Sequence, residues 1–319
     1  MAEQHSLPRK ICSRNSLFFP LMALSFSVAG FLLPRPCLES ALAQPVGNLP
    51  PVSHYPAHLS AEETQSLVRR VLSTEISASA NESNPMQYSL RKSSPRFSTT
   101  KLIVETKDGD VARLIAINDR PLTPTEVQAE QARLQTLATD PRLQRHRQER
   151  ERNDAERVHK IISALPEAFL YQFSGIVNTP QGPSYRLTFQ PNPDFNPQDL
   201  EAQVLKAMAG ELWIDVAEQR VTRLQCRRLH SVDYGFGILG KLEEGGTLLL
   251  EQADVGNHQW RTTHMVMVMN ARVFLKTIKL DTTLELSQFS PVIAGMDYRQ
   301  AIEILEANAQ KNPHSARGN

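Results

Sequence analysis

A glycine pattern at residues 235–240 is the one stretch of this sequence whose spacing fits a known chemistry. Gly235-x-Gly237-x-x-Gly240 has the G-x-G-x-x-G spacing that binds a pyrophosphate where a strand runs into a helix. Here Gly245-Gly246 follows closely and would stop a helix after about one and a half turns. The chain then resumes as a strand-like run from Thr247. The context therefore predicts a turn in an antiparallel meander and not a dinucleotide site.

Other catalytic and metal-binding patterns are missing from the sequence. A kinase glycine loop would need the catalytic-loop and D-F-G signatures downstream, and neither occurs. G-x-S-x-G, H-E-x-x-H and C-x-x-C do not occur either. His54 and His58 are four residues apart, but Pro56 disfavours the helix that would bring them to one metal ion. We predict a protein that is not an enzyme, with no catalytic residue, no cofactor and no metal site.

The N-terminus has the features of an export signal. Basic residues Arg9, Lys10 and Arg14 precede an apolar run over 17–33, and Ala41-Leu42-Ala43 offers a small-x-small cleavage site. We predict a signal peptide over 1–43 and a periplasmic mature protein with no transmembrane segment. An uncleaved membrane anchor is the alternative, although the run is short for a bilayer span.

Charge and cysteine content restrict the partners and the covalent chemistry. The net charge of +1 gives no case for nucleic acid as a partner. Of the three cysteines, Cys12 and Cys37 leave with the signal, so Cys226 stands alone and cannot form an intrachain disulfide. It lies in a strand pattern, where we interpret it as a small buried hydrophobic residue.

The next segment combines a leader, a helix and three strands. Residues 44–58 are rich in proline and predict a flexible leader. Ser60 and Glu63 form a capping box, and apolar residues follow at helical spacing. Strand patterns then cover about 87–92, 98–106 and 111–118. Asp108-Gly109 joins the last two as a hairpin with a primed turn.

A long charged helical insertion follows over 123–165. Thr123 and Glu126 form a capping box around Pro124, and Asp140-Pro141 begins a second helix. This second helix carries oppositely charged residues four apart, such as Arg152 and Glu156. The balance of charges predicts a solvated helix face and not a nucleic-acid-binding helix.

From residue 167 the hydrophobic period changes to two. Strands are predicted at 167–178 and 184–190, a short helix from Asn196-Pro197 to about Met208, then strands at 211–216, 220–229, 246–254, 259–270 and 272–286. The short gaps between them imply antiparallel neighbours. A C-terminal helix from about Asp297 and a disordered tail complete 291–319. The fold class is α+β with an antiparallel sheet.

The apolar strand faces are the remaining candidates for a site. Alternating aromatic and aliphatic residues would line one side of a curved sheet, and a row of methionines would add a soft, adaptable surface. The candidate cavity residues are Phe169, Tyr171, Phe173, Tyr185, Leu187, Phe189, Leu212, Ile214, Met265 and Met267. The alternative is that the same residues form an ordinary core.

Four segments in this order carry a family resemblance. They are Arg113–Leu122, Leu165–Phe169, Gly210–Asp215 and Glu251–Trp260. Over about residues 85–290 the chain resembles exported bacterial proteins with a LolA/LolB-like (outer-membrane lipoprotein-sorting carrier) fold. The resemblance implies a half-barrel sheet with helices over its concave face, here a single domain over 59–290. It also implies an apolar cavity that shields the acyl chain of a lipoprotein or lipid.

Two features depart from those carriers: the helical insertion over 123–165 and the lack of a lipobox. Three hypotheses remain open. The first is a periplasmic carrier or chaperone for a lipidated or hydrophobic ligand. The second is a non-catalytic envelope scaffold that binds a protein partner. The third is a periplasmic hydrolase, for which the sequence supplies no convergent polar residues.

Overall fold

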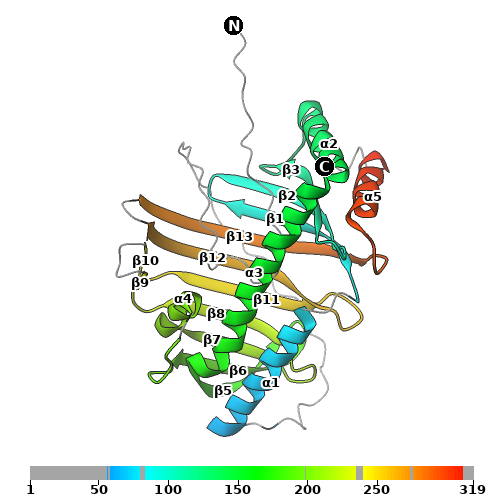
Figure 1. The fold of residues 1–319 in the computed structure, drawn as a ribbon. Coiled ribbons are helices and arrows are strands. Elements are labelled where there is room, and N and C mark those ends of the chain that lie inside the picture. Colours follow the sequence, from blue (N-terminus) through cyan, green and yellow to red (C-terminus); the bar gives the residue numbers. More distant parts are fainter. Residues whose placement is uncertain are drawn as a thin grey trace, which may run out of the picture.

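A single curved antiparallel sheet organises the protein. The computed structural model describes residues 56, 58–79, 83–197, 199–234, 240–273 and 276–311. The sheet is open, with strand order β4-β3-β2-β1-β13-β12-β11-β8-β7-β6-β5, and β10 and β9 branch from β12 (Figure 1). Helices pack on the sheet, which confirms the predicted α+β class with a curved antiparallel sheet.

The strand and helix bounds follow the predicted pattern closely. The strands are β1 (Met86–Ser94), β2 (Phe97–Val104), β3 (Val111–Ile117), β4 (Arg120–Pro121), β5 (Phe169–Thr179), β6 (Gly182–Pro191), β7 (Met208–Asp215), β8 (Val221–Arg228), β9 (Val232–Tyr234), β10 (Gly240–Leu242), β11 (Thr247–Asp254), β12 (Trp260–Val273) and β13 (Lys276–Pro291). The helices are α1 (Ala61–Ser79), α2 (Pro124–Thr139), α3 (Pro141–Ala168), α4 (Leu200–Gln203), the 3₁₀ turn η1 (Val204–Ala207) and α5 (Tyr298–Lys311).

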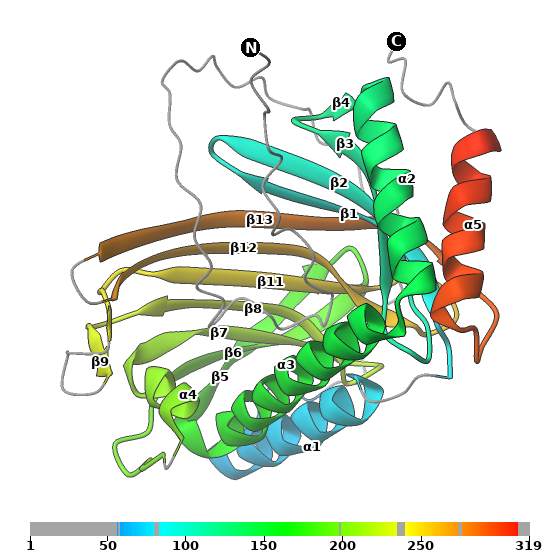
Figure 2. The same cartoon turned by 45° about the horizontal axis from the view of Figure 1, so that its top comes forward.

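Helices cover the two ends of the sheet on opposite faces. At one end, α1 and α3 pack together and against β5 (Figure 2). Their buried residues join those of β5–β8 in the largest hydrophobic cluster. At the other end, α2 and α5 pack over Val104 and Val111. The opposite face of the same strands carries Tyr88 and Ile103, so these two helices lie on the side that α1 does not cover.

Side-chain capping fixes the starts of the predicted helices. Ser60 and Glu63 exchange hydrogen bonds of 3.2 and 2.8 Å at the start of α1. Thr123 and Glu126 form the expected box at α2. The Asp140 carboxylate accepts a 3.0 Å hydrogen bond from the Arg142 amide at α3. These helices therefore begin where the sequence predicts.

Three expectations were inexact. The helix predicted from Asn196 begins at Leu200 and turns into a 3₁₀ helix at Val204. In the 107–110 hairpin Gly109 has φ +94°, but Asp108 is not among the residues with positive φ, so the turn is not the predicted primed type. The charged helix is solvated on one side only.

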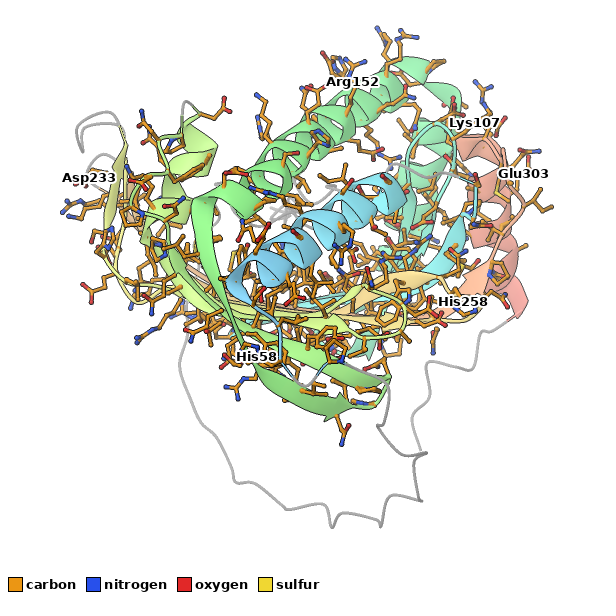
Figure 3. The ribbon with its side chains drawn as sticks, turned by 90° about the horizontal axis from the view of Figure 1, so that it is seen from below. His58, Lys107, Arg152, Asp233, His258 and Glu303 are labelled. Atoms are coloured by element: carbon orange, nitrogen blue, oxygen red, sulfur yellow. The ribbon has the colours of Figure 1, made fainter. Side chains whose placement is uncertain are left out.

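The buried side of α3 docks on this hairpin. Gln144 and Glu151 are buried. Gln144 and Arg147 donate hydrogen bonds to the backbone oxygens of Asp108 and Asp110. Arg152, in contrast, projects from the side of α3 away from the sheet (Figure 3). The insertion is thus tied to the sheet by polar contacts that helical charge pairing does not predict.

Several predictions fall outside the described residues. These include the signal segment over 1–43, most of the proline-rich leader over 44–58, the tail beyond Lys311 and Gly235 to Leu239 of the glycine pattern. Gly240 is described and begins the strand β10, which pairs with β9 and β12. Across the described residues, no helix has both the length and the apolar composition needed to cross a membrane.

A buried ion pair anchors α1 to the sheet. The Glu75 carboxylate accepts two hydrogen bonds from the Arg220 guanidinium, at 2.8 and 2.9 Å, and a third from the Val221 amide at 3.0 Å. Both side chains are largely removed from solvent, at 5% and 12% exposed. Arg220 also lies 6.0 Å from the ring centroid of Trp260. The contact fixes the C-terminal part of α1 to the loop before β8.

Replacing Glu75 by alanine should therefore lower the free energy of unfolding by about 3–5 kcal/mol, because it leaves a buried guanidinium without its carboxylate. Glu75→Gln should cost less, since its amide oxygen still accepts from the Val221 amide. Urea denaturation of both variants measures the difference. Equal stability of Glu75→Ala and the unmodified protein would show that α1 is held by apolar packing alone.

Candidate ligand-binding face

One row of directly paired residues crosses eight strands on a single face of the sheet. Paired residues of antiparallel strands point to the same side, so the register alone places them together. From β1 to β5 the row is Lys92, Leu284, Met265, Leu250, Leu224, Leu212, Leu187 and Phe173. We call this the first inner row and its side of the sheet the inner face. Seven of its eight members are apolar.

A second row runs beside the first on the same face. From β13 to β5 it contains Thr282, Met267, Leu248, Cys226, Gly210, Phe189 and Tyr171. Gly210 is required there, because a Cβ atom would lie 2.0 Å from the Gln225 carbonyl oxygen and 2.7 Å from the Cys226 Cα. The missing side chain lets β7 and β8 approach closely at the centre of the row.

The opposite face of the sheet, which we call the outer face, carries charged residues that are paired strand by strand in the same way. One residue away from the first inner row, the paired residues are Arg91, Glu285, His264, Glu251, Arg223, Trp213 and Arg186. We call this the outer row. Its members contact each other: Arg91 and Glu285 at 2.6 Å, His264 and Glu251 at 3.0 Å, and Arg223 and Glu251 at 3.0 Å. These pairs are partly exposed and each contributes about 0–1 kcal/mol.

The outer row also sets the protonation of its acids and bases. Hydrogen bonds to Asp119 and Glu285 raise the pKa of the Arg91 guanidinium, and the Arg186 guanidinium lowers the pKa of the Glu211 carboxyl. Arg223 lies 5.1 Å from the ring centroid of Trp213. The face therefore stays charged and hydrated while the other face is apolar.

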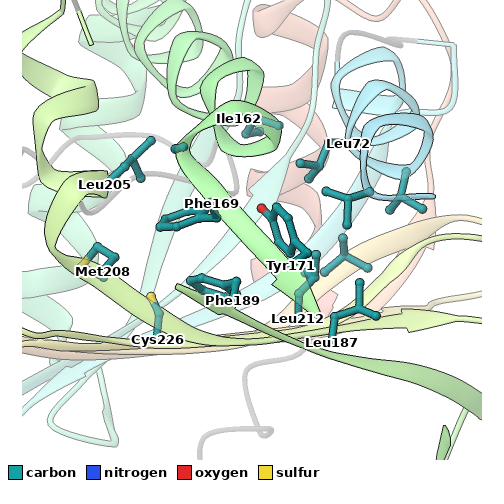
Figure 4. Close-up of a cluster of buried hydrophobic side chains, with 14 of the residues drawn as sticks. Leu72, Ile162, Phe169, Tyr171, Leu187, Phe189, Leu205, Met208, Leu212 and Cys226 are labelled. Atoms are coloured by element: carbon teal, nitrogen blue, oxygen red, sulfur yellow. The ribbon is translucent and has the colours of Figure 1, made fainter. Parts of the chain in front are cut away.

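All ten candidate residues lie on the inner face or in the core beneath the helices. Seven of them, from β5, β6 and β7, belong to the largest cluster, and Phe173 of β5 packs against it from a partly buried position. Figure 4 shows Phe169, Tyr171 and Phe189 between the sheet and Ile162 of α3. The Phe169 and Phe189 ring centroids are 4.6 Å apart. This end of the face is a packed aromatic core.

Met265 and Met267 lie on the same face nearer the middle of the sheet. Both are buried, as is Met269. The alternate residues of β12 face outward, and Val268 is 39% exposed. The strand β12 therefore has one buried methionine side and one side that reaches solvent.

Burial controls the two titratable groups of the inner face. It raises the pKa of Tyr171, whose hydroxyl donates a 3.1 Å hydrogen bond to the Leu165 carbonyl oxygen. It also raises the pKa of the Cys226 thiol to about 12, which keeps the sulfur protonated at neutral pH. Neither group is activated for nucleophilic chemistry.

Histidines and acids do not assemble into a metal site in the described part of the chain, where no group of three or more potential ligands comes together. His264 belongs to the outer row. His258 lies before β12 and contacts Glu218 at 3.1 Å. Among the described residues, the geometry therefore offers an apolar inner face and no cluster of potential metal ligands.

Comparison with solved structures finds two similar proteins. An outer-membrane lipoprotein-sorting protein domain, so described, from Vibrio parahaemolyticus matches with a TM-score of 0.31 and 10% identity, over 77% of this chain and 100% of that one. A DUF1329 family protein from Desulfovibrio piger matches with a TM-score of 0.28 and 10% identity, over 74% of this chain and 95% of that one. No family model and no curated protein sequence matches the chain.

The sequence prediction missed several inner-face residues. Leu250 and Leu284 are in the first inner row, but a run of three leucines in β11 hides the alternation that would place Leu250. In β13 the alternation is visible, because Ile278, Leu280 and Leu284 are partly buried between exposed polar residues. Lys92 was missed because a lysine does not mark an apolar face.

Gly210→Ala should lower the free energy of unfolding by at least about 1–3 kcal/mol, since the new Cβ would force β7 away from β8. Gly240→Ala is the matched control, because its nearest obstacle is the Arg272 carbonyl oxygen at 3.3 Å. Urea denaturation reports both values. Equal losses at the two positions would contradict the close approach at Gly210.

The Cys226 thiol should not react with a thiol reagent in the folded protein, because it is buried and protonated. The test compares reagent uptake by the unmodified chain and by Cys226→Ser. We expect equal uptake under native conditions and one additional reacting thiol in the unmodified chain after denaturation. A native difference of one thiol would place Cys226 on an accessible surface.

Proposed function

We propose that the protein is a non-catalytic periplasmic carrier or chaperone that holds a hydrophobic ligand, such as a lipid or a lipoprotein acyl chain, against the inner face. The observation that carries this proposal is the first inner row, with seven consecutive apolar residues on seven adjacent strands. An ordinary core needs an apolar face only where another layer covers it. Here the helix packing is most extensive at the ends of the sheet, and Leu250 and Met265 in the middle of the row are buried as well.

The methionines give the inner face the adaptability that a carrier needs. Met265, Met267 and Met269 are buried. A ligand must therefore be accommodated by repacking, which unbranched and polarizable side chains permit at low cost. Each methylene of a bound chain that leaves water contributes about 0.8 kcal/mol. A long acyl chain can thus supply enough free energy to drive the rearrangement.

Export supports the same proposal. The basic flank, apolar run and small-x-small site at the N-terminus predict delivery to the periplasm. A lipidated protein that crosses this aqueous compartment must have its acyl chain shielded from water. A curved sheet with one apolar and one charged face can shield a chain on one side and remain soluble on the other.

Two measurements test the carrier function. The protein is purified from the periplasm without detergent, and its bound lipids are identified by mass spectrometry. A fluorescent fatty acid is then titrated into delipidated protein. We expect co-purified lipid and saturable binding. A folded protein with no bound lipid and no uptake of the fatty acid would contradict the proposal.

Met267→Lys should abolish most of this binding, because it places a charge in the middle of the inner face. Val268→Lys is the matched control, since it changes the next residue of the same strand but points to the outer face. Circular dichroism checks that both variants fold. Equal binding by the two variants would show that the ligand does not use the inner face.

A further inference from the structure

Lys92 is the β1 member of the first inner row and is the one member of that row that is not apolar. It pairs with Leu284 of β13 on one side and with Thr99 of β2 on the other. Leu90, two residues earlier on the same face, is buried with Tyr88 and Leu286. A lysine at this position puts an ammonium group at the end of a continuous hydrocarbon surface.

The charge of Lys92 is not neutralised by an ion pair among the described residues. Its neighbour Arg91 faces outward and binds Asp119 and Glu285. For Lys92 itself, no ion pair or hydrogen bond of the side chain is found within the described part of the chain. The residue reaches solvent, yet the protein around it removes enough water to lower the pKa of its ammonium group. A cation in this setting gains more than a fully hydrated lysine from an anion brought to it.

A second lysine lies near Lys92 on the inner face. Lys101 of β2 pairs with Leu90, so it lies on the inner face diagonal to Lys92. Diagonal neighbours on adjacent strands are about 7–8 Å apart, within reach of long side chains. Because Lys101 already takes part in a polar or electrostatic interaction, the head-group proposal rests on Lys92.

The length of the row suits a molecule with one head and one tail. Seven strand-to-strand steps separate Lys92 from Phe173, or about 34 Å along the sheet at about 4.8 Å per step. An acyl chain that enters from Lys92 would meet Leu284 first, and then Met265 and Leu250, which are buried and must be uncovered by repacking. Its head stays at the solvent-accessible end. A ligand without a charged head would leave the ammonium group of Lys92 without an anion.

We propose, resting on the carrier function above, that the ligand is an anionic amphiphile with a carboxylate or phosphate head and an acyl chain, and that Lys92 binds the head. The acyl chain then lies along the first inner row toward the aromatic end of the sheet. Lys92 is thus the residue that sets the orientation of the ligand and selects charged over neutral lipids.

The test compares palmitate with methyl palmitate, which has the same chain but no charge, and with hexadecyl phosphate. Each displaces a fluorescent fatty-acid reporter from the full chain. We expect palmitate to bind at least about tenfold more tightly than methyl palmitate, as one charge-assisted hydrogen bond provides. Lys92→Gln should remove this preference and Lys92→Arg should keep it. The phosphate arm shows which head is preferred.

Lys279→Gln is the matched control, because Lys279 is an exposed residue of β13 on the outer face. It should leave all affinities unchanged. Equal binding of palmitate and methyl palmitate by the unmodified protein, or an unchanged preference in Lys92→Gln, would overturn the head-group site and leave the carrier function standing. Binding of none of the probes would overturn the carrier function itself.

Discussion

The register of the antiparallel sheet is the constraint on which the rest of the structure depends. Because side chains alternate with a period of two, a slip of one residue would exchange the inner and outer rows. Leu250 would then take the position of Glu251, and Met265 that of His264. The charge pairs of the outer row also favour the observed register, since Arg91, Glu285 and their neighbours meet only when the strands are aligned in this way.

The distribution of helices follows from that division of faces. At the β5 end the inner face carries large aromatic residues, and α1 and α3 bury them. At the β2–β3 end the apolar residues on the opposite face, such as Val104 and Val111, bind α2 and α5. The helical insertion bridges the two ends, because the buried C-terminal half of α3 holds the aromatic cluster and Gln144 near its start binds the hairpin beside β3. The inner-face residues of the middle strands, such as Leu250 and Met265, are buried as well.

The features of the fold that could be predicted from the sequence are those that depend on residues close together in the chain. Capping residues such as Thr123 and Asp140 are local, and the helices begin where they predict. The strands and the aromatic set around Phe169 were predicted from their alternation. The pairing of Leu250 with Met265, and of Lys92 with Leu284, is not local, because it depends on which strands become neighbours. The same holds for Gly210, whose role depends on a close approach by β8.

The glycine pattern at residues 235–240 also shows that a local signal alone does not predict a function. The G-x-G-x-x-G motif specifies only the local spacing of its glycines, whereas its chemistry also requires a helix directly after them. Here Gly240 continues into the strand β10. Lys92 belongs to no motif, and its importance arises only because six strands beyond β1 and β13 supply apolar partners in register. Under the proposed function, specificity for an amphiphile would come from the position where a charge interrupts the apolar alternation, and no sequence motif marks that position. Such a site is visible only after the rows are traced strand by strand.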